Sequence, residues 1–279
     1  MENNVTAEQY RQDSLREEYG KSDQTFLRRF NHQKILNILR TNGPMSRIDL
    51  AKTSKLDKKT ITNIVTDMLT KGQVHVSAVQ KNGHGRSKEM LALSGDFCYC
   101  IGIDIGGTHV TAVLADFTAH ILSSDNIDLH THIPPETILD MCDMLVESAL
   151  KESGITMDKI SGIGVTFPGI LDHKTGKAIL VENLPDWKNI PVKKIFEEKY
   201  DKPVFVEDCS RTMALAELWL GENDCDNFIV FDLGLGIGCG IVINQNLFTG
   251  SNGKSGEIGH MIVDINGPPC TCGRNGCIE

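Results

Sequence analysis

The hydrophobic residues in the first third of the chain recur at the spacing of short amphipathic helices. The pattern predicts helices in residues 30–42, 46–55 and 57–72. Ser46 and Asp57 are typical helix N-caps, whereas Asn42-Gly43-Pro44 and Gly72 are typical of helix ends. The third helix is expected to bury a regular apolar stripe formed by Ile61, Ile64, Val65, Met68 and Leu69.

Two strand-like runs follow these helices, in residues 74–79 and 88–93. The pair Asn82-Gly83 between them is a turn signal that favours a hairpin. Helices followed by such a hairpin are the pattern of a winged helix-turn-helix, which we expect to span residues 23–95. Residues 1–22 are polar, with mixed charges, and are expected to form an N-terminal arm.

From Phe97 onward the hydrophobic pattern favours strands alternating with helices, as in an α/β fold. A continuous apolar strand ends near Asp104, and a glycine turn follows it. The backbone amides of Gly106, Gly107 and Thr108 could cradle a phosphate. A tight hairpin without a ligand is the alternative interpretation of this turn taken alone. It is not a dinucleotide-binding fingerprint, because no G-x-G-x-x-G opens a helix here.

The charge of the chain is unevenly distributed. Residues 21–95 carry 14 Lys and Arg against 5 Asp and Glu, whereas residues 96–279 carry 12 against 27. A basic N-terminal region in an otherwise acidic chain indicates that double-stranded DNA contacts residues 21–95 only. The chain shows no signal peptide and no apolar run long enough to span a membrane, so a cytoplasmic location without membrane contact is expected.

The third predicted helix carries the residue types that read DNA. Lys59, Asn63 and Thr66 lie opposite its apolar stripe, which suits contacts with bases and phosphates. A solvated helix face is the usual explanation for any one such residue, but helix order, wing and local charge together favour DNA binding. The candidate DNA-binding residues, including those at the tip of the wing, are Lys58, Lys59, Thr60, Thr62, Asn63, Lys81 and Arg86.

The end of the chain contains a set of metal-ligand residues. Cys270, Cys272 and Cys277 follow His260, and three thiolates with one imidazole form a complete tetrahedral set for zinc. Buried free thiols or a disulfide are the alternatives, but disulfides are rare in the cytosol. A closed site has no open coordination position, so this zinc is expected to be structural.

Carboxylates bracket this predicted zinc site. Glu257 precedes His260 and Glu279 follows Cys277, and carboxylates beside an imidazole would suit the hydroxyls of a polyol. The runs G-E-x-G-H and C-x-C-G-x-x-G-C-x-E resemble the signature of the ROK family of repressors and sugar kinases. The resemblance implies a winged helix-turn-helix followed by an actin-like sugar-kinase α/β fold, incomplete at the C-terminus.

The resemblance assigns further residues. Asn183, in the run N-L-P-x-W, occupies the position expected to hydrogen-bond a sugar, and Gly234, Gly236 and Gly238 correspond to a second phosphate loop. The sugar-binding candidates are thus Asn183, Asp208, Glu257, His260 and Glu279. The phosphate loops depart from the kinases, with His109 where they commonly have Lys and Leu235 where they have Thr.

A third departure concerns catalysis. Aligned on Glu207 and on Ala214–Glu217, Cys209 falls on the catalytic Asp of ROK kinases, and a thiol is a poor general base. Asp208 is adjacent, but neighbours on an extended segment point to opposite sides, so we do not expect it to replace the base. An alignment shifted by one residue would restore Asp208 as the base. We therefore expect a chain that is not an enzyme.

These inferences lead to one functional hypothesis and two alternatives. The chain is expected to be a sugar-responsive transcriptional regulator, most simply a repressor, which binds operator DNA as a homodimer or dimer of dimers and takes a small sugar as effector. An ATP-dependent sugar kinase with an appended DNA-binding domain is the alternative. The second alternative is a DNA-binding protein without a ligand, in which Asn183, Glu257 and Glu279 would have no binding role.

The expected domains are the arm, the winged helix-turn-helix, a first actin-like lobe in residues 96–212 and a partial second lobe in residues 213–279 with the zinc knuckle. ROK proteins generally continue beyond the G-C-x-E motif, whereas this sequence stops at Glu279. The second lobe is therefore expected to expose apolar surface and to lack affinity for adenine nucleotides.

Overall fold

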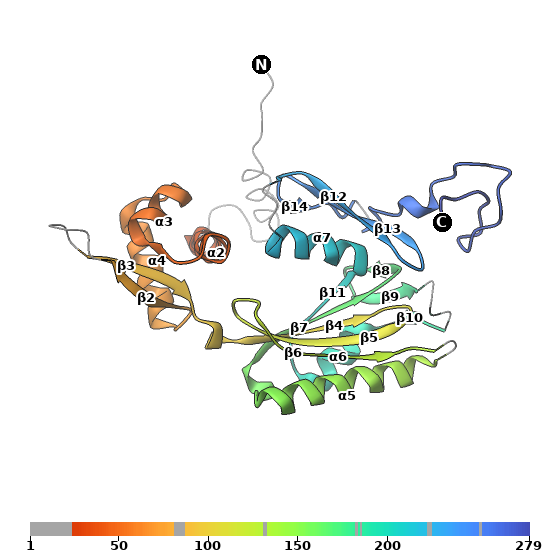
Figure 1. Ribbon diagram of the computed structural model, residues 1–279, viewed down its shortest axis with the longest axis horizontal. Coiled ribbons are helices and arrows are strands. Elements are labelled where there is room, and N and C mark those ends of the chain that lie inside the picture. The colour runs from red at the N-terminus through yellow and green to blue at the C-terminus, as the bar shows by residue number, and fades with distance from the viewer. Residues whose placement is uncertain are drawn as a thin grey trace, which may run out of the picture. The chain divides into compact units, whose positions relative to one another are not determined.

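The chain forms two separately packed units in the computed structural model (Figure 1). The structure describes residues 24–80, 87–130, 133–181, 184, 186–221, 225–250 and 253–279. One unit contains the chain up to Phe97 together with Phe117–His120, and the other contains Cys98–Asp116 and Ile121–Glu279. No helix among the described residues is long and apolar enough to cross a membrane.

The first unit is a winged helix-turn-helix, as the sequence pattern predicts. Its helices are α2 (Gln24–Asn42), α3 (Arg47–Ser54) and α4 (Lys58–Thr70). They pack with a small antiparallel sheet of strand order β1-β3-β2, formed by β1 (Met45–Ser46), β2 (Val74–Gln80) and β3 (Lys88–Leu93). A short 3-10 turn, η1 (Gly95–Phe97), follows the sheet.

The predicted caps and stripe of this unit are confirmed. The side chain of Ser46 accepts a hydrogen bond from Asp49 N, and that of Asp57 accepts from Lys59 N and Thr60 N, so each cap satisfies free amides in the first turn of its helix. The core of the unit is formed by the α4 stripe and residues from its neighbours, namely Ile35, Leu39, Leu50, Ile61, Ile64, Val65, Met68, Val74 and Leu91. Leu69 packs against this core while staying partly exposed.

The second unit is built on a five-stranded sheet of order β11-β7-β4-β5-β6. Its strands are β4 (Tyr99–Ile105), β5 (His109–Asp116), β6 (Ile121–Asp128), β7 (Ile160–Phe167) and β11 (Val204–Asp208). The strands β4, β7 and β11 are parallel, whereas β5 and β6 pair antiparallel beside them. Parallel strands end at the same edge of a sheet, so Asp104, Thr166 and Asp208 are brought together there.

Helices and smaller sheets surround this five-stranded sheet. They are α5 (Pro135–Ser153), η2 (Met157–Lys159), β8 (Ile170–Asp172), β9 (Lys177–Leu180), β10 (Lys188–Ile190) and α6 (Val192–Tyr200). Helix α5 covers β5 and β6 with a buried face that includes Ile138, Leu145 and Val146. The strands β8, β9 and β10 form a separate antiparallel sheet.

The last part of the second unit packs around helix α7 (Cys209–Leu220). Helix α7 lies against the antiparallel sheet of β12 (Phe228–Leu233), β13 (Ile237–Ile243) and β14 (Asn246–Leu247). The expected domain boundary between residues 212 and 213 falls inside α7. On β12, Ile229, Phe231 and Leu233 are exposed, so the expected apolar surface is present.

Candidate functional site

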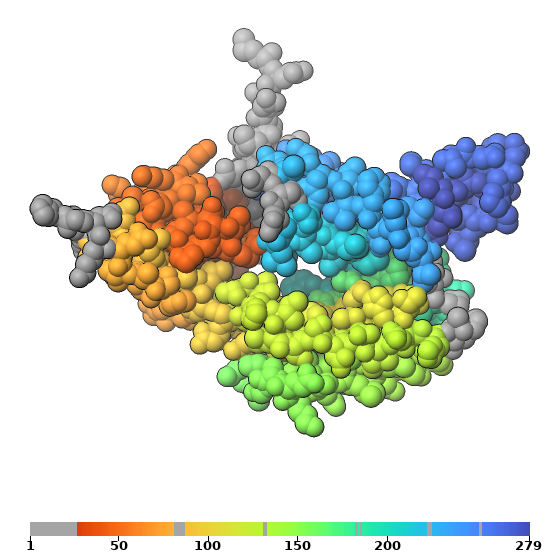
Figure 2. Space-filling model, in the orientation of Figure 1, coloured from red at the N-terminus to blue at the C-terminus, as the bar shows by residue number. Residues whose placement is uncertain are grey.

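The second unit contains a cavity of about 640 Å³ at the carboxyl edge of its five-stranded sheet. Figure 2 shows the molecule hollowed between α7 (cyan) and the strands of that sheet (yellow to green). The cavity is lined by the turn after β4, the end of β7, the start of α7, the turn after β12, and the segment that begins at Ser255. Ligands of α/β proteins bind at such edges, so this cavity is the candidate binding site.

Both predicted phosphate loops line this one cavity. Gly106, Gly107 and Thr108 form the turn between β4 and β5, and Gly234 to Gly236 form the turn between β12 and β13. An aspartate precedes each turn by two residues: Asp104 on β4 and Asp232 on β12. The two loops therefore lie at one site although they are far apart in the sequence.

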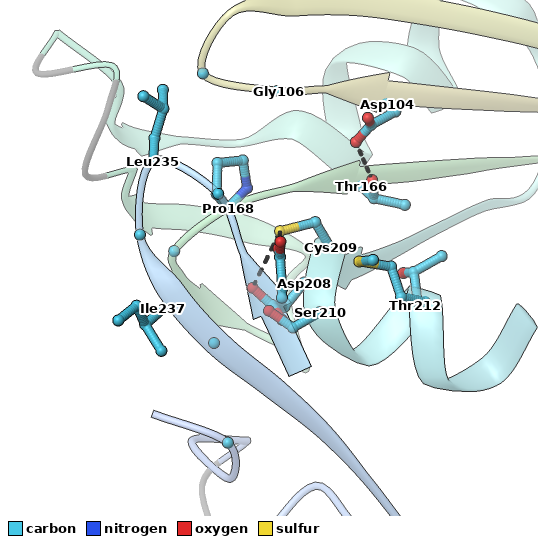
Figure 3. A pocket seen from close by; sticks show the side chains of 18 of the residues that line it. Asp104, Gly106, Thr166, Pro168, Asp208, Cys209, Ser210, Thr212, Leu235 and Ile237 are labelled. Carbon is cyan, nitrogen blue, oxygen red and sulfur yellow. Dashed lines mark hydrogen bonds between the residues drawn. The ribbon is translucent and has the colours of Figure 1, made fainter. Parts of the chain in front are cut away.

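Asp104 is held by two neighbours at the edge of the cavity. Thr166 Oγ1 donates to Asp104 Oδ1 at 2.5 Å, and Figure 3 shows the two side chains facing each other from β7 and β4. His109 Nε2 lies 3.1 Å from Asp104 Oδ2. The ring of His109 also covers the first glycine turn, because a Cβ on Gly106 would lie 2.9 Å from it.

The glycines of the second loop have unequal roles. A Cβ on Gly238 would lie 2.2 Å from Ser210 Oγ, which is closer than real contacts allow. Gly238 thus lines the cavity at the point where β13 packs closely against Ser210 of α7. Gly234 and Gly236 have only ordinary contacts at their Cβ positions, with the carboxylates of Asp232 and Glu279.

The expectation that Asp208 and Cys209 point to opposite sides is wrong. Both line the same cavity, as Figure 3 shows. The reason is local: β11 ends at Asp208 and α7 begins at Cys209, so the alternation of an extended strand stops between them. Asp208 is the N-cap of α7, and its Oδ1 accepts from Arg211 N at 3.1 Å.

The protonation of these neighbours follows from their burial. Burial and the adjacent carboxylates of Asp208 and Asp232 raise the pKa of the Cys209 thiol to about 12. This side chain therefore stays protonated as a thiol at neutral pH. Burial also raises the pKa of Asp208, against the opposing effects of Arg211.

A buried arginine ties three segments together behind the cavity. Arg211 is 1% exposed, and its Nε donates to Glu207 Oε1 at 2.7 Å. Its Nη1 donates to the carbonyl of Ser255 at 3.2 Å, and its Nη2 lies 3.5 Å from His173 Nε2. The arginine thus joins the end of β11 to the segment that leads to Glu257.

The predicted zinc ligands converge. The ligand atoms of His260, Cys270, Cys272 and Cys277 all lie within 4.8 Å of one another. Cys272 Sγ lies 3.6 Å from Cys277 Sγ, and Cys270 Sγ lies 3.7 Å from His260 Nδ1. A tetrahedral zinc with Zn–S bonds of about 2.3 Å would set sulfur atoms about 3.8 Å apart, so the cluster fits this ion. Hydrogen bonds from the Arg274 backbone and side chain lower the pKa of Cys272 to about 6, whereas burial and hydrogen bonds to Cys272 and Cys270 raise the pKa of Cys277 to about 11.

The predicted acidic residues around the knuckle also line the cavity. His260 lies in the 3-10 turn η3 (Ile258–His260), and its Nε2 is 4.0 Å from Glu257 Oε2. Glu279 Oε2 accepts from Ile237 N at 3.4 Å. Four of the sugar-binding candidates, Asp208, Glu257, His260 and Glu279, therefore meet at one site. Asn183 lies outside the described residues.

The candidate DNA-binding residues of α4 share an outward face in the first unit. Lys58, Lys59, Thr62 and Asn63 are exposed, whereas Thr60 is half-buried. Two hydroxyls are used within the helix: Thr60 Oγ1 donates to Asp57 Oδ2 at 2.5 Å and Thr62 Oγ1 to the Lys58 carbonyl at 2.7 Å. Lys81 and Arg86 lie outside the described residues.

The sequence analysis missed three residues of the site: Thr166, Arg211 and Asp232. A signal for Asp232 was present, because the run F-D-L-G repeats the pattern of I-D-I-G around Asp104. Thr166 and Arg211 carry no such signal. Their roles depend on partners at Asp104 and Ser255, which are 62 and 44 residues away in the sequence.

Comparison with known proteins finds a family match for each of the two units. A model of the ROK family matches residues 100–279, and a model of the MarR family matches residues 31–83. The xylose repressor of Caldicellulosiruptor bescii is 30% identical over 256 residues, which cover 91% of this chain and 64% of that protein. The xylose repressor of Bacillus subtilis is 32% identical over 262 residues, which cover 92% of this chain and 67% of that protein.

A solved structure is also similar to this chain along most of its length. A ROK family transcriptional regulator described as a homologue of the E. coli Mlc protein superposes with a TM-score of 0.73 at 27% identity. The match covers 90% of this chain and 63% of that one. This chain thus spans a little under two thirds of that structure and of the first of the two xylose repressors. With a family model that matches well over half of its residues, the chain belongs to the ROK family.

Proposed function

We propose that this protein is a sugar-responsive DNA-binding transcriptional regulator of carbohydrate metabolism, acting as a repressor. One observation carries the proposal: the chain aligns over 91% of its length with a protein named as a xylose repressor, and the alignment includes both units. In this proposal residues 23–95 bind operator DNA, and the cavity in residues 96–279 binds the effector.

The chemistry of the cavity supports a polyol effector. Carboxylates from β4, β11, β12 and the segment from Ser255 to Glu279 line it together with hydroxyl side chains such as Thr166 and Ser210. Carboxylate oxygens accept hydrogen bonds, and sugar hydroxyls donate them, so such a lining can satisfy several hydroxyls at once. Asn183 completes this set in the proposal, on the strength of the resemblance of its motif.

The experiment is to select duplexes from a random library with the purified protein and then to titrate sugars against the selected DNA complex. We expect a specific duplex to bind and one sugar to change its affinity. A protein that selects no sequence, or that binds DNA identically with every sugar, would refute the proposal. Alanine variants of Lys58, Asn63 and Arg86 then test the proposed DNA contacts.

We also propose that zinc fills the His260, Cys270, Cys272 and Cys277 cluster as a structural ion. All ligand positions of a tetrahedral ion are taken by protein atoms, which is the arrangement of structural sites. The ion would hold η3 and Glu279 at the edge of the cavity, and so orient Glu257 and His260. Metal analysis of the folded protein should find about one zinc per chain.

A homodimer or a dimer of dimers is the proposed functional assembly. Helix-turn-helix regulators bind pseudo-palindromic operators with two recognition helices one helical turn of DNA apart. Light scattering of the protein bound to the selected duplex tests this directly. One chain per duplex would contradict it.

A sugar kinase is the second candidate function, and one observation favours it: Asp208 lines the cavity beside Cys209. Its carboxylate could in principle act as general base, although its Oδ1 already caps α7. ADP release from ATP with a panel of sugars tests this alternative. Turnover that is lost in Asp208→Asn and kept in Cys209→Ala would establish the kinase.

A further inference from the structure

A polar groove on the first unit borders the outward face of α4. The groove has a volume of about 680 Å³ and lies between α4 and the N-terminal half of α2. Helix α2 contributes Arg28 and Asn31 to its lining, and α4 contributes a stripe that includes Asn63, Thr66 and Asp67. Asn63 is one of the candidate DNA-binding residues, so the groove continues the proposed DNA-binding face of α4 onto a second helix.

Arg28 is held in this groove by a weak ion pair. Its side chain is 71% exposed, and its Nη2 lies 3.6 Å from Asp67 Oδ1, which is too long for a hydrogen bond. Exposed ion pairs contribute little to stability. The guanidinium can therefore exchange Asp67 for another anion at small cost.

Asp67 keeps a closer partner when Arg28 leaves it. Lys71 Nζ donates to Asp67 Oδ2 at 2.8 Å from one helical turn further along the chain. This hydrogen bond is the main cause that lowers the pKa of Asp67, so the carboxylate is charged at neutral pH. His32 Nε2 also lies 4.0 Å from Asp67 Oδ2, but burial lowers the pKa of His32, which is therefore neutral there.

The anion that fits this groove is a phosphate of the DNA backbone. Arginine binds phosphate oxygens through paired N–H donors, and phosphates flank every base pair that α4 could read. Asn31 lies three residues after Arg28, on the same face of α2, and its side-chain amide offers a further donor. The sequence analysis assigned neither residue, because both precede the predicted recognition helix and wing.

We infer that α2 contributes a phosphate contact to the DNA interface, in which Arg28 leaves Asp67 and binds a backbone phosphate with Asn31 as a second donor. This inference rests on the proposed DNA-binding function and adds a helix to the interface. Such a contact fixes the position of α4 on the duplex and reads no sequence itself. Asp67 is then a positioning residue, because it holds Arg28 at the groove before DNA binds.

The test compares Arg28→Ala with Arg29→Ala in the full chain. Both arginines are exposed and adjacent on α2, but Arg29 does not belong to the lining of the groove as the described residues form it. Fluorescence anisotropy measures affinity for the selected duplex and for an unrelated duplex of equal length at several salt concentrations.

Arg28→Ala should lower the slope of log affinity against log salt by about 1, as the loss of one phosphate contact does. It should weaken binding to both duplexes equally, on the order of 5-fold near about 150 mM salt. Arg29→Ala should leave the slope close to that of the wild type. Arg28→Lys should restore most of the slope, because it keeps the positive charge at the groove.

Asp67→Asn tests the same phosphate without a change at Arg28. It removes a negative charge beside the proposed phosphate, so binding to both duplexes should strengthen on the order of 3-fold. Thermal unfolding of each variant checks the fold, which an exposed position such as Arg28 should not disturb.

The outcomes separate this inference from the proposed function. A wild-type chain that binds no duplex overturns DNA binding, and this inference with it. A wild type that binds with salt dependence, while Arg28→Ala keeps the full slope, overturns the α2 contact and leaves DNA binding intact. Equal loss of slope in Arg28→Ala and Arg29→Ala shows a general charge effect and overturns the contact at the groove.

Two further results would also overturn the contact. Asp67→Asn that binds DNA no more tightly than the wild type would show that no phosphate lies in the groove. Arg28→Ala that changes the number of chains per duplex in light scattering, at an unchanged slope, would make the groove a contact between copies of the chain.

Discussion

At the scale of single residues, the site depends on carboxylates whose environments differ. Asp104 is held by Thr166 and His109 at the rim, whereas Asp208 is buried at the start of α7. Burial raises the pKa of Asp208, so the folded protein holds the proton of this carboxyl group more tightly than the unfolded chain does.

Asp208 should make the stability of the protein depend on pH. The stability from its raised pKa is fully present below the unfolded value of about 4 and is lost as the pH rises through the folded value. Asp208→Asn keeps an oxygen for Arg211 N but has no charge to bury. We expect the difference in Tm, variant minus wild type, to increase by on the order of 2 °C as the pH is raised from 4 to 7.

Thermal unfolding across this pH range, with Glu198→Gln as the surface control, provides the measurement. The control carboxylate is exposed, so its difference from the wild type should change little with pH. A Tm difference for Asp208→Asn that stays constant from pH 4 to pH 7 would contradict the buried-carboxyl argument.

Gly240 is a second residue with a testable role. A Cβ at this position would lie 2.4 Å from Ala214 Cβ and 2.5 Å from the Ser210 carbonyl, neither of which can move without shifting α7. Gly240→Ala should therefore lower the free energy of unfolding by about 1–3 kcal/mol, as overpacking does. Gly164→Ala, with open space at its Cβ, is the matched control and should not destabilise the protein in denaturant titrations.

At the scale of elements, the zinc knuckle and the loop before it form one wall of the cavity. Isolated bridges join Ile262 to Cys277 and Pro269 to Asn275, and little other regular structure holds this segment among the described residues. Turn hydrogen bonds, such as those from Val263 N to the Gly276 carbonyl and from Cys270 N to the Arg274 carbonyl, fold the segment back on itself, and the metal would tie these turns together.

Removal of one ligand should therefore affect stability and sugar binding together. In Cys272→Ser we expect loss of zinc, a lower Tm and a weaker sugar response, since η3 no longer orients Glu257. Metal analysis, thermal unfolding and calorimetry measure the three effects. Cys225→Ser removes an exposed thiol elsewhere and should change none of them. A Cys272→Ser protein that retains its zinc would show that the cluster is not the metal site.

At the scale of the whole molecule, the chain combines a basic unit with an acidic one. The net charge of −9 conceals a local excess of basic residues in residues 21–95. Binding to duplex DNA is therefore expected to come from this unit alone and to depend strongly on salt.

The salt dependence distinguishes two kinds of contact on α4. Lys58→Ala should weaken binding to all duplexes and reduce the slope of log affinity against log salt by about 1, as the loss of one phosphate contact does. Asn63→Ala should relax the preference for the selected sequence while keeping the slope. Titrations at several salt concentrations measure both effects. Equal slopes in the wild type and Lys58→Ala would remove Lys58 from the DNA contact.

The pattern of residues by itself determined the secondary-structure elements of this protein and the sites whose residues are close together in the sequence. The helix caps at Ser46 and Asp57, the α4 stripe, the wing strands and both glycine turns follow from neighbours in the sequence. The His and Cys cluster proposed to bind zinc also follows from sequence, because three of its four residues lie within eight residues and glycines permit the tight turns between them. Local spacing is sufficient wherever the partners are close along the chain.

The tertiary structure alone decided how distant segments meet. It placed Asp208 and Cys209 on one cavity because a strand ends between them, and it brought Asp232 to the same cavity as Asp104. It gave Gly238 a packing role against Ser210, and it buried Arg211 between Glu207 and Ser255. These relations depend on how β13 and the knuckle pack against α7, and no local periodicity or spacing records such packing.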